Sequence, residues 1–281
     1  MMESDQHCFE LVRAGDKDRY LASLFAPEDK RKYLHALYAL NIEVSRIPEQ
    51  VSDPAIGEIR YQWWLDTIDG IYHGEVSPHP VAQSLAAAIE AGDLPKHALQ
   101  NLVKAKIFDL YADPMPSLLD LEGYLGETSS GLIQMASLIL GREQALESAE
   151  AAGLAGVAYG LAGILRSLPR LCAMGKCYVP ISLLKQRHAS VADVISAEND
   201  IAVRIVLSEL RLKIKERLEQ ARRLSWTIKP AVMPAFLHVS LTEVYLNKLD
   251  AASERVLKSG AEIAQFRKQW ILWKFAKAES F

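Results

Sequence analysis

The sequence predicts an all-α protein, and three features carry this prediction. Helix-start signals recur along the chain, each a proline or a capping residue placed ahead of an apolar run. Within those runs the apolar residues recur at helical spacing, as Leu40, Val44 and Ile47 do. Nowhere do four to eight residues alternate in polarity between Asn-Gly or Asp-Gly turns, as strands of a hairpin would. No composition break or internal repeat divides the chain, so we expect residues 1–281 to form a single domain.

The first three helix starts are marked by prolines. Pro27 is followed by two acidic residues, which suits the first turn of a helix because proline lacks the amide left unpaired there and acids meet the positive dipole end. Asp53–Pro54 repeats the signal ahead of AIGEIRYQWWLDTIDGIY, and Pro95 precedes KHALQNLVKAKIFDLY. Between them, the segment YHGEVSPHP with His73 and His79 is expected to turn the chain rather than to catalyse a reaction.

Further helices are expected in the second half of the chain. Ser117 is a candidate N-cap for a helical run that Gly141 ends. A helix is expected over about 145–168, followed by a loop through 178–180. Another helix is expected over about 199–224, and two shorter ones near the C-terminus. The glycine- and alanine-rich run 151–165, within the helix expected over about 145–168, is shorter than the roughly 20 apolar residues that span a bilayer. We therefore expect this helix to pack in the middle of the protein.

Composition excludes several classes of function. The 281 residues carry a net charge of −3, whereas a nucleic-acid binder normally shows a basic excess, so no nucleic-acid partner is expected. The three cysteines, Cys8, Cys172 and Cys177, form neither a CxxC pair nor a disulfide framework, and we expect reduced thiols. Residues 1–20 are acidic and polar and resemble neither a signal peptide nor a transit peptide, which favours a cytoplasmic location.

No catalytic or metal-binding motif stands out from the residues alone. The chain contains no GxGxxG or GxxxxGK[ST] loop, no HExxH and no GxSxG elbow. None of the seven histidines falls in a ligand-like pair, and no His or Cys cluster completes a zinc site. We therefore expect none of the histidines and cysteines to be a metal ligand.

Four ordered stretches of the chain resemble the squalene/phytoene synthase family: 19–40, 63–85, 121–141 and 160–180. The resemblance implies an isoprenoid synthase fold, an all-α helical bundle around a central cavity. It also implies an activity, in which two aspartate-rich helices hold Mg²⁺ and the metal grips the diphosphates of prenyl substrates. Such chemistry needs hard oxygen ligands for Mg²⁺ and positive charge where the leaving diphosphate develops.

At the positions of the two aspartate-rich motifs this sequence departs from the family pattern. The residues found there are Ser45, Arg46 and Glu49 at the first motif, and Ser167, Arg170 and Leu171 at the second. Only Glu49 keeps a carboxylate, and Pro48 and Pro169 are expected to break or kink the helices that carry these positions. No catalytic residue, metal ligand or cofactor is therefore expected, and Mg²⁺ would be needed only if prenyl transfer persists.

The departure also resembles one branch of the family, which lacks the aspartate motifs and takes part in maturation of respiratory complex I. The stretches that carry this resemblance are 41–44, 55–57, Trp63–Trp64 and 229–237. It implies a non-catalytic helper whose partner is a complex I subunit or assembly intermediate. Two alternatives stay open: a farnesyl or geranylgeranyl diphosphate transferase with an atypical site, and a protein that binds an isoprenoid or a lipid phosphate.

Three arginines are candidates for phosphate binding. If the two motif helices face each other, Arg46, Arg166 and Arg170 would converge on the cavity and could bind phosphate oxygens in bidentate fashion. The alternative is that they pair with Glu43, Glu49 or Asp66, or reach solvent.

Three aromatic residues, Tyr38, Trp64 and Tyr124, are candidates for the lining of an isoprenoid-sized cavity. Aromatic residues at helical spacing are also common in an ordinary core, and this alternative stays open.

The stretch 261–281 combines apolar and basic residues. It contains four large apolar residues, Ile263, Phe266, Trp270 and Trp273, together with four basic ones, Arg267, Lys268, Lys274 and Lys277. This pattern is typical of a basic amphipathic helix and predicts peripheral contact with an anionic inner membrane. The alternative is a terminal helix docked on its own domain.

Overall fold

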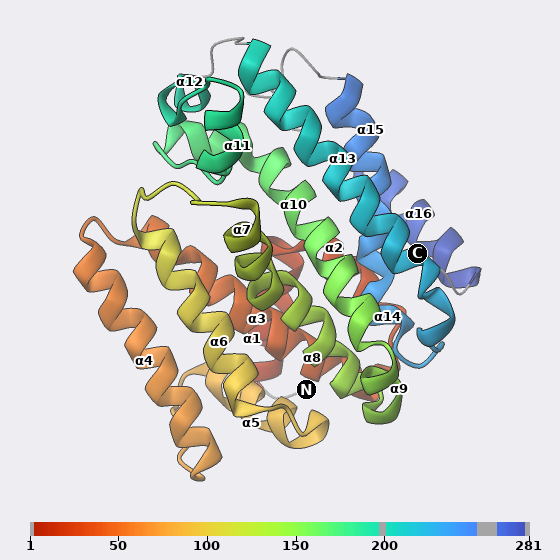
Figure 1. The fold of residues 1–281 in the computed structure, drawn as a ribbon. Coiled ribbons are helices and arrows are strands. Elements are labelled where there is room, and N and C mark those ends of the chain that lie inside the picture. Colours follow the sequence, from red (N-terminus) through yellow and green to blue (C-terminus); the bar gives the residue numbers. More distant parts are fainter. Residues whose placement is uncertain (1–2, 197–200, 252–262, 279–281) are drawn as a thin grey trace.

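The computed structural model describes residues 3–196, 201–251 and 263–278, and within these residues it contains helices, turns and loops but no strand (Figure 1). The predicted all-α fold is confirmed. The buried hydrophobic side chains of the described residues form one contiguous cluster, to which almost every helix contributes. A contiguous core of this kind holds the helices in one bundle.

The N-terminal half forms eight α-helices. They are α1 (Glu3–Gly15), α2 (Lys17–Ser23), α3 (Glu28–Gln50), α4 (Pro54–Tyr72), α5 (Pro80–Gly92), α6 (Lys96–Lys106), α7 (Leu118–Leu125) and α8 (Gly131–Leu140). The expected starts at 54 and 118 are present, with the side chain of Asp53 capping Ala55 and that of Ser117 capping Asp120. The polar stretch 1–20 gave no helix signal. Glu3–Gly15 within it are nevertheless helical, because α1 packs a narrow face containing Cys8 and Val12 against α3 and α5.

The described residues of the C-terminal half form eight more. They are α9 (Arg142–Glu147), α10 (Ala149–Ala173), α11 (Ile181–Gln186), α12 (Val191–Ile195), α13 (Ile201–Arg223), α14 (Met233–Phe236), α15 (Leu241–Ala251) and α16 (Gln265–Lys277). Residues 199–200 of the helix expected over 199–224 lie outside the described residues. The loop expected through 178–180 is present, and the short helices α11 and α12 follow it.

Neither proline of the motif segments ends its helix, so of the expected break or kink the break does not occur. Pro48 lies inside α3, which continues to Gln50, and Pro169 lies inside α10, which continues to Ala173. A proline at 48 cannot donate the backbone hydrogen bond that the carbonyl of Val44 would otherwise accept. The hydroxyl of Tyr61 donates to this carbonyl at 3.0 Å instead, so the acceptor stays paired.

The glycine-rich helix α10 runs through the middle of the bundle (Figure 1). It packs against α13 and α15 on one side and against a π-helical turn, Gly126–Ser130, on the other. The Oγ of Ser129 donates to the Gly156 carbonyl and that of Ser130 to the Gly153 carbonyl, each at 2.7 Å. Although α10 is long and apolar enough to cross a membrane, half of its most apolar window is buried inside the molecule. It therefore packs centrally, as expected.

Candidate functional site

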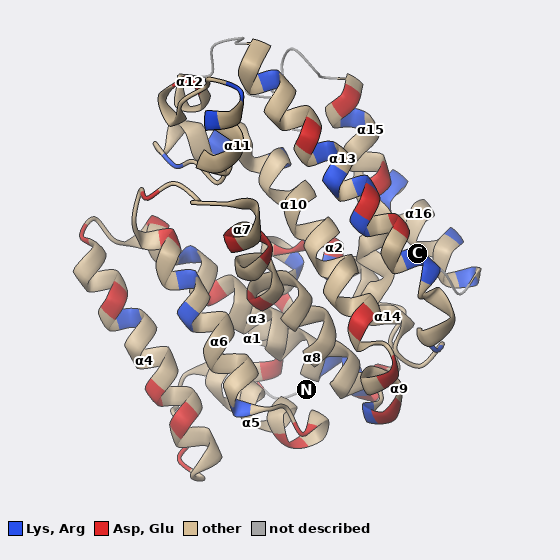
Figure 2. Ribbon diagram, in the orientation of Figure 1, with Lys and Arg blue, Asp and Glu red and all other residues tan. Residues whose placement is uncertain are grey.

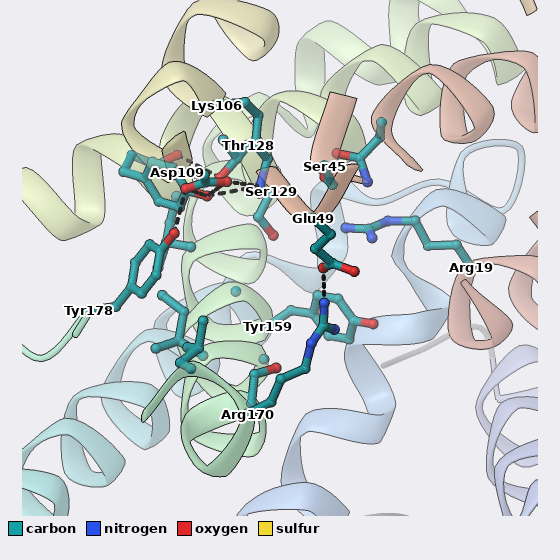
Figure 3. Close-up of a pocket in the computed structure, with 18 residues that line it drawn as sticks. Arg19, Ser45, Glu49, Lys106, Asp109, Thr128, Ser129, Tyr159, Arg170 and Tyr178 are labelled. Atoms are coloured by element: carbon teal, nitrogen blue, oxygen red, sulfur yellow. Dashed lines mark hydrogen bonds and ion pairs between the residues drawn. The ribbon is translucent and has the colours of Figure 1, made fainter. Parts of the chain in front are cut away.

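The structure brings the two motif segments together across one pocket of about 350 Å³. Ser45 and Glu49 reach it from α3, and Arg170 reaches it from α10 (Figure 3). Ser167 and Leu171 of α10 line it as well. Residues three or four apart share one face of a helix, so each segment presents these positions to the pocket together. A smaller cavity of about 130 Å³ adjoins this pocket along the same two segments.

An ion pair between Arg170 and Glu49 joins the two helices at the pocket (Figure 3). The side chains are 63% and 44% exposed, so solvent screens their attraction and the pair stabilises the fold by less than about 1 kcal/mol. The sequence left two alternatives for Arg170, binding of a phosphate or pairing with an acid. In the structure Arg170 lines the pocket and pairs with Glu49.

The opposite wall of the pocket centres on Asp109, whose side chain is buried. Its Oδ1 accepts hydrogen bonds from the hydroxyls of Tyr178 at 2.5 Å and Tyr124 at 2.9 Å, and Lys106 Nζ lies 3.3 Å from Oδ2. Lys176 Nζ donates to the backbone carbonyl of Asp109. Burial, followed by the charge of Asp109, raises the pKa of both tyrosines, so both hydroxyls stay protonated and act as donors.

A buried guanidinium completes the polar lining. Arg19 on α2 is 7% exposed and points into the pocket (Figure 3). Its Nη1 donates to Asp16 at 2.7 Å, and its guanidinium carbon lies 5.2 Å from the ring centroid of Tyr159. Burial alone would lower the pKa of Arg19, but the charge of Asp16, the neighbouring Tyr159 and Tyr38 and the hydrogen bond to Asp16 together outweigh it and raise that pKa. The group therefore carries a fixed positive charge at the pocket wall.

The other two arginines expected at the cavity lie elsewhere. A Cβ on Gly15 of α1 would lie 3.0 Å from Nη2 of Arg46, so the Arg46 side chain runs along α1 instead of into the pocket. Arg166 lies 3.5 Å from Asp18 and over the ring of Tyr245 at 3.6 Å. Successive helical residues point about 100° apart, which turns both side chains away from the face that carries Glu49 and Arg170.

Of the three aromatic residues expected to line the cavity, only Tyr124 does so. Trp64 is 3% exposed and packs edge-on against Trp63 at 4.9 Å and His79 at 5.3 Å. Tyr38 is equally buried, with the guanidinium of Arg19 at 5.8 Å from its ring. For these two residues the alternative of an ordinary core position holds, because both side chains are almost fully buried.

The donor set does not fit the Mg²⁺ that the family resemblance implies. Among the described residues no group of three or more His, Cys, Asp or Glu side chains could hold a metal ion. The pocket offers two carboxylates, Glu49 and Asp109, and each already pairs with a cation. The guanidinium of Arg19 adds a further positive charge to the same wall, which raises the energy of a divalent ion placed there.

Sequence reasoning missed the group around Asp109 and the contribution of Arg19. Asp109 ends a helical run with no motif around it, and its donors come from three separate segments. Tyr178 was visible as part of a family-like segment, but nothing local indicated that its hydroxyl reaches Asp109. Only the packing of these segments places the groups together.

Comparisons with known proteins place this chain among isoprenoid synthase folds. The profile described as squalene/phytoene synthase matches residues 12–273. The chain is 30% identical over 246 residues to NADH dehydrogenase (ubiquinone) complex I, assembly factor 6, of Bos taurus, covering 88% of this chain and 74% of that protein. It is 26% identical over 220 residues to phytoene synthase of Thermus thermophilus, covering 76% and 72%.

Among solved structures, squalene synthase HpnC from Alicyclobacillus acidocaldarius superposes with a TM-score of 0.78 at 20% identity. The match covers 89% of this chain and 94% of that chain. At this identity the likeness concerns the fold, and it agrees with the helical bundle around a cavity expected from the sequence.

Proposed function

The chain belongs to the squalene/phytoene synthase family, and from this premise we propose that it is a non-catalytic member that assists the assembly of respiratory complex I. The observation that carries the proposal is the 30% identity, over 88% of the chain, to a complex I assembly factor. Its partner would be a complex I subunit or an assembly intermediate of that complex.

The chemistry of the pocket supports the non-catalytic part of the proposal. Loss of a prenyl diphosphate by ionisation needs metal ions or other cations that are free to receive the leaving group. Here the motif positions carry serine, arginine and leucine, and the one remaining acid, Glu49, is engaged by Arg170. This donor set favours a family member in which condensation no longer occurs.

Deletion of the gene tests the assembly role. We expect loss of NADH-driven ubiquinone reduction and of the fully assembled complex on native gels, with both restored by the wild-type gene. Succinate-driven respiration serves as the control and should not change. Intact complex I together with loss of C30 or C40 isoprenoids would contradict the proposal and favour the atypical prenyl transferase.

A second candidate function is binding of an isoprenoid or lipid phosphate without turnover. The observation that favours it is the pocket itself, which has about 350 Å³ of space and the cations Arg19, Lys106 and Arg170 on its walls. Several hydroxyl groups line the same space, and neutral donors of this kind suit phosphate oxygens. This candidate is compatible with an assembly role, since a ligand could accompany the protein partner.

A further inference from the structure

The C-terminal helix α16 presents opposite faces to the protein and to solvent. Of the stretch 261–281, residues 263–278 are described, and the rest lies outside the described residues. The inner face is buried through Lys268, Ile271 and Leu272 and packs against α2 and the 3-10 helix Leu237–Ser240. Lys268 Nζ forms a 2.7 Å ion pair with Asp18, in which both side chains are buried. The helix is therefore fixed on the domain.

The outer face carries a ridge of three large aromatic side chains. Phe266, Trp270 and Trp273 are 74%, 60% and 54% exposed. They recur at i, i+4 and i+7, so they stand in line on the side of the helix opposite to Lys268. Single exposed apolar residues are ordinary, but three in line on consecutive turns mark an interaction surface. Docking of the helix thus leaves these three aromatic side chains facing outward.

Positive charge borders this aromatic ridge. Arg267, Lys274 and Lys277 are exposed, and the helix Gln265–Lys277 contains no acid (Figure 2). Lys274 Nζ lies 5.8 Å from the ring centroid of Trp270, and Lys277 Nζ lies 5.3 Å from that of Trp273. Cations placed this close to exposed indoles suit a surface that is apolar within and anionic at its boundary.

A groove on the other flank of α16 adds a second basic border. It has a volume of about 340 Å³ and lies between α16, which contributes Gln265 and Gln269, and the helices α1 and α2. Arg13 and Lys17 line it, and neither forms an ion pair with a described residue. Asp16, next to Lys17, is already engaged by Arg19. The aromatic ridge therefore runs between two sets of cations.

We propose that α16 binds the protein to the surface of a membrane that contains anionic lipids. The three aromatic side chains enter the headgroup region, Arg267, Lys274 and Lys277 pair with lipid phosphates, and the groove at Arg13 and Lys17 receives a headgroup. Every exposed charge on α16 is positive. This favours an anionic lipid bilayer over an apolar protein surface as the partner of the helix. The inference does not depend on the assembly role.

Co-sedimentation of the full chain with vesicles tests the inference. We expect binding to phosphatidylcholine vesicles that contain phosphatidylglycerol, with a blue shift of tryptophan emission, and little binding without the anionic lipid. Trp270→Ala combined with Trp273→Ala should weaken partitioning by roughly tenfold or more. Trp226→Ala is the matched control, because this indole is 72% exposed on a different segment, and it should bind as the wild type does.

A charge reversal separates electrostatic from apolar attraction. Lys274→Glu combined with Lys277→Glu should weaken binding to anionic vesicles by roughly tenfold or more. Lys104→Glu combined with Lys185→Glu changes the net charge equally. Both control lysines are exposed, on α6 and α11, which Figure 1 places on the other side of the molecule from α16. This control should not change binding.

Four outcomes would overturn the inference. They are no binding to anionic vesicles, equal binding to neutral vesicles, unchanged binding of the Trp270 and Trp273 double variant, and self-association lost in that variant without vesicle binding. The last outcome would assign the ridge to a second copy of the chain. Circular dichroism confirms that each variant is folded, and none of these readouts depends on complex I.

Discussion

Arg46 and Arg170 show how one residue step decides what a side chain can do. Both stand at motif positions of facing helices, yet Arg170 lines the pocket and Arg46 lies against Gly15 of α1. Ser45 and Glu49 are four residues apart and share the pocket face, whereas Arg46 is rotated by about 100° from Ser45. A charge at a motif position therefore reaches the pocket only if its helical phase matches.

This difference gives a prediction for phosphate binding. If the pocket binds farnesyl diphosphate at low salt, Arg170→Ala should weaken binding by roughly fivefold, about 1 kcal/mol, because an exposed cation at the pocket wall is lost. Arg46→Ala is the matched control and should bind as tightly as wild type. Isothermal titration with and without Mg²⁺ provides the measurement.

Two results would count against the pocket as a phosphate site. One is an equal loss in both arginine variants, which would indicate non-specific attraction. The other is binding that requires Mg²⁺, since the carboxylates of Glu49 and Asp109 already pair with Arg170 and Lys106.

At the scale of elements, two glycines of α10, Gly153 and Gly156, differ in whether neighbouring atoms leave room for a side chain. A Cβ added at Gly156 would lie 2.3 Å from the Cα of Ser130, whereas one added at Gly153 would meet nothing within 4 Å. The close approach at Gly156 allows the π-helical turn to bring Ser129 and Thr128 to the pocket. The glycine at this position is therefore required by packing between two elements.

Alanine at each of these two positions tests this conclusion. Gly156→Ala should lower the free energy of unfolding by about 1–3 kcal/mol, because backbone atoms of Ser130 cannot move away cheaply. Gly153→Ala should leave it unchanged or raise it by up to about 1 kcal/mol, because alanine favours the helix. Urea unfolding measures both. Equal effects of the two substitutions would show that packing against the π-helical turn is not limiting.

At the scale of the whole molecule, a buried ion pair joins the two ends of the chain. Asp18 on α2 accepts hydrogen bonds from Lys268 on α16 and Tyr245 on α15, each at 2.7 Å, and lies 3.5 Å from Arg166 on α10. Lys268 and Asp18 are 250 positions apart in sequence. The buried carboxylate of Asp18 therefore helps to fix the position of α16, and with it the direction of the aromatic ridge.

Asp18→Asn should lower the free energy of unfolding by about 3–5 kcal/mol, since it leaves the charge of Lys268 buried and unpaired. Replacing both partners, Asp18→Asn with Lys268→Met, should cost less than Asp18→Asn alone, because the charge of Lys268 is then no longer buried without its partner. Thermal and urea unfolding measure the effect. A double variant that is less stable than the single one would contradict this account.

The same carboxyl predicts a pH dependence of stability. Burial alone would raise the pKa of Asp18, but the hydrogen bond and charge of Lys268, with the charge of Arg166, outweigh it and hold that pKa below its usual range. The contribution is then fully present above the unfolded pKa of about 3.9 and is lost as pH falls through the folded pKa. Below about pH 4 the wild type should lose stability more steeply than Asp18→Asn.

Much of the local structure could be predicted from the sequence. The helix starts at Pro54 and Leu118 follow from capping side chains, and the family resemblance identified the bundle and its two facing segments. The exposed ridge on α16 was visible as aromatic and basic residues at helical spacing. Of the break or kink expected at Pro48 and Pro169, the break does not occur, because both helices continue past the proline. At Pro48, the hydroxyl of Tyr61, from another helix, pairs the acceptor that proline leaves free.

The sequence by itself determined where helices begin and which residues share a face, because these depend on neighbours within about one helical turn. It also indicated the family, through the order of four stretches along the chain. Only the tertiary structure decided that Asp109 gathers Tyr124, Tyr178 and Lys106, and that Lys268 meets Asp18. These groups come from distant segments. Their meeting depends on how whole helices pack around the core, which no local pattern of residues encodes.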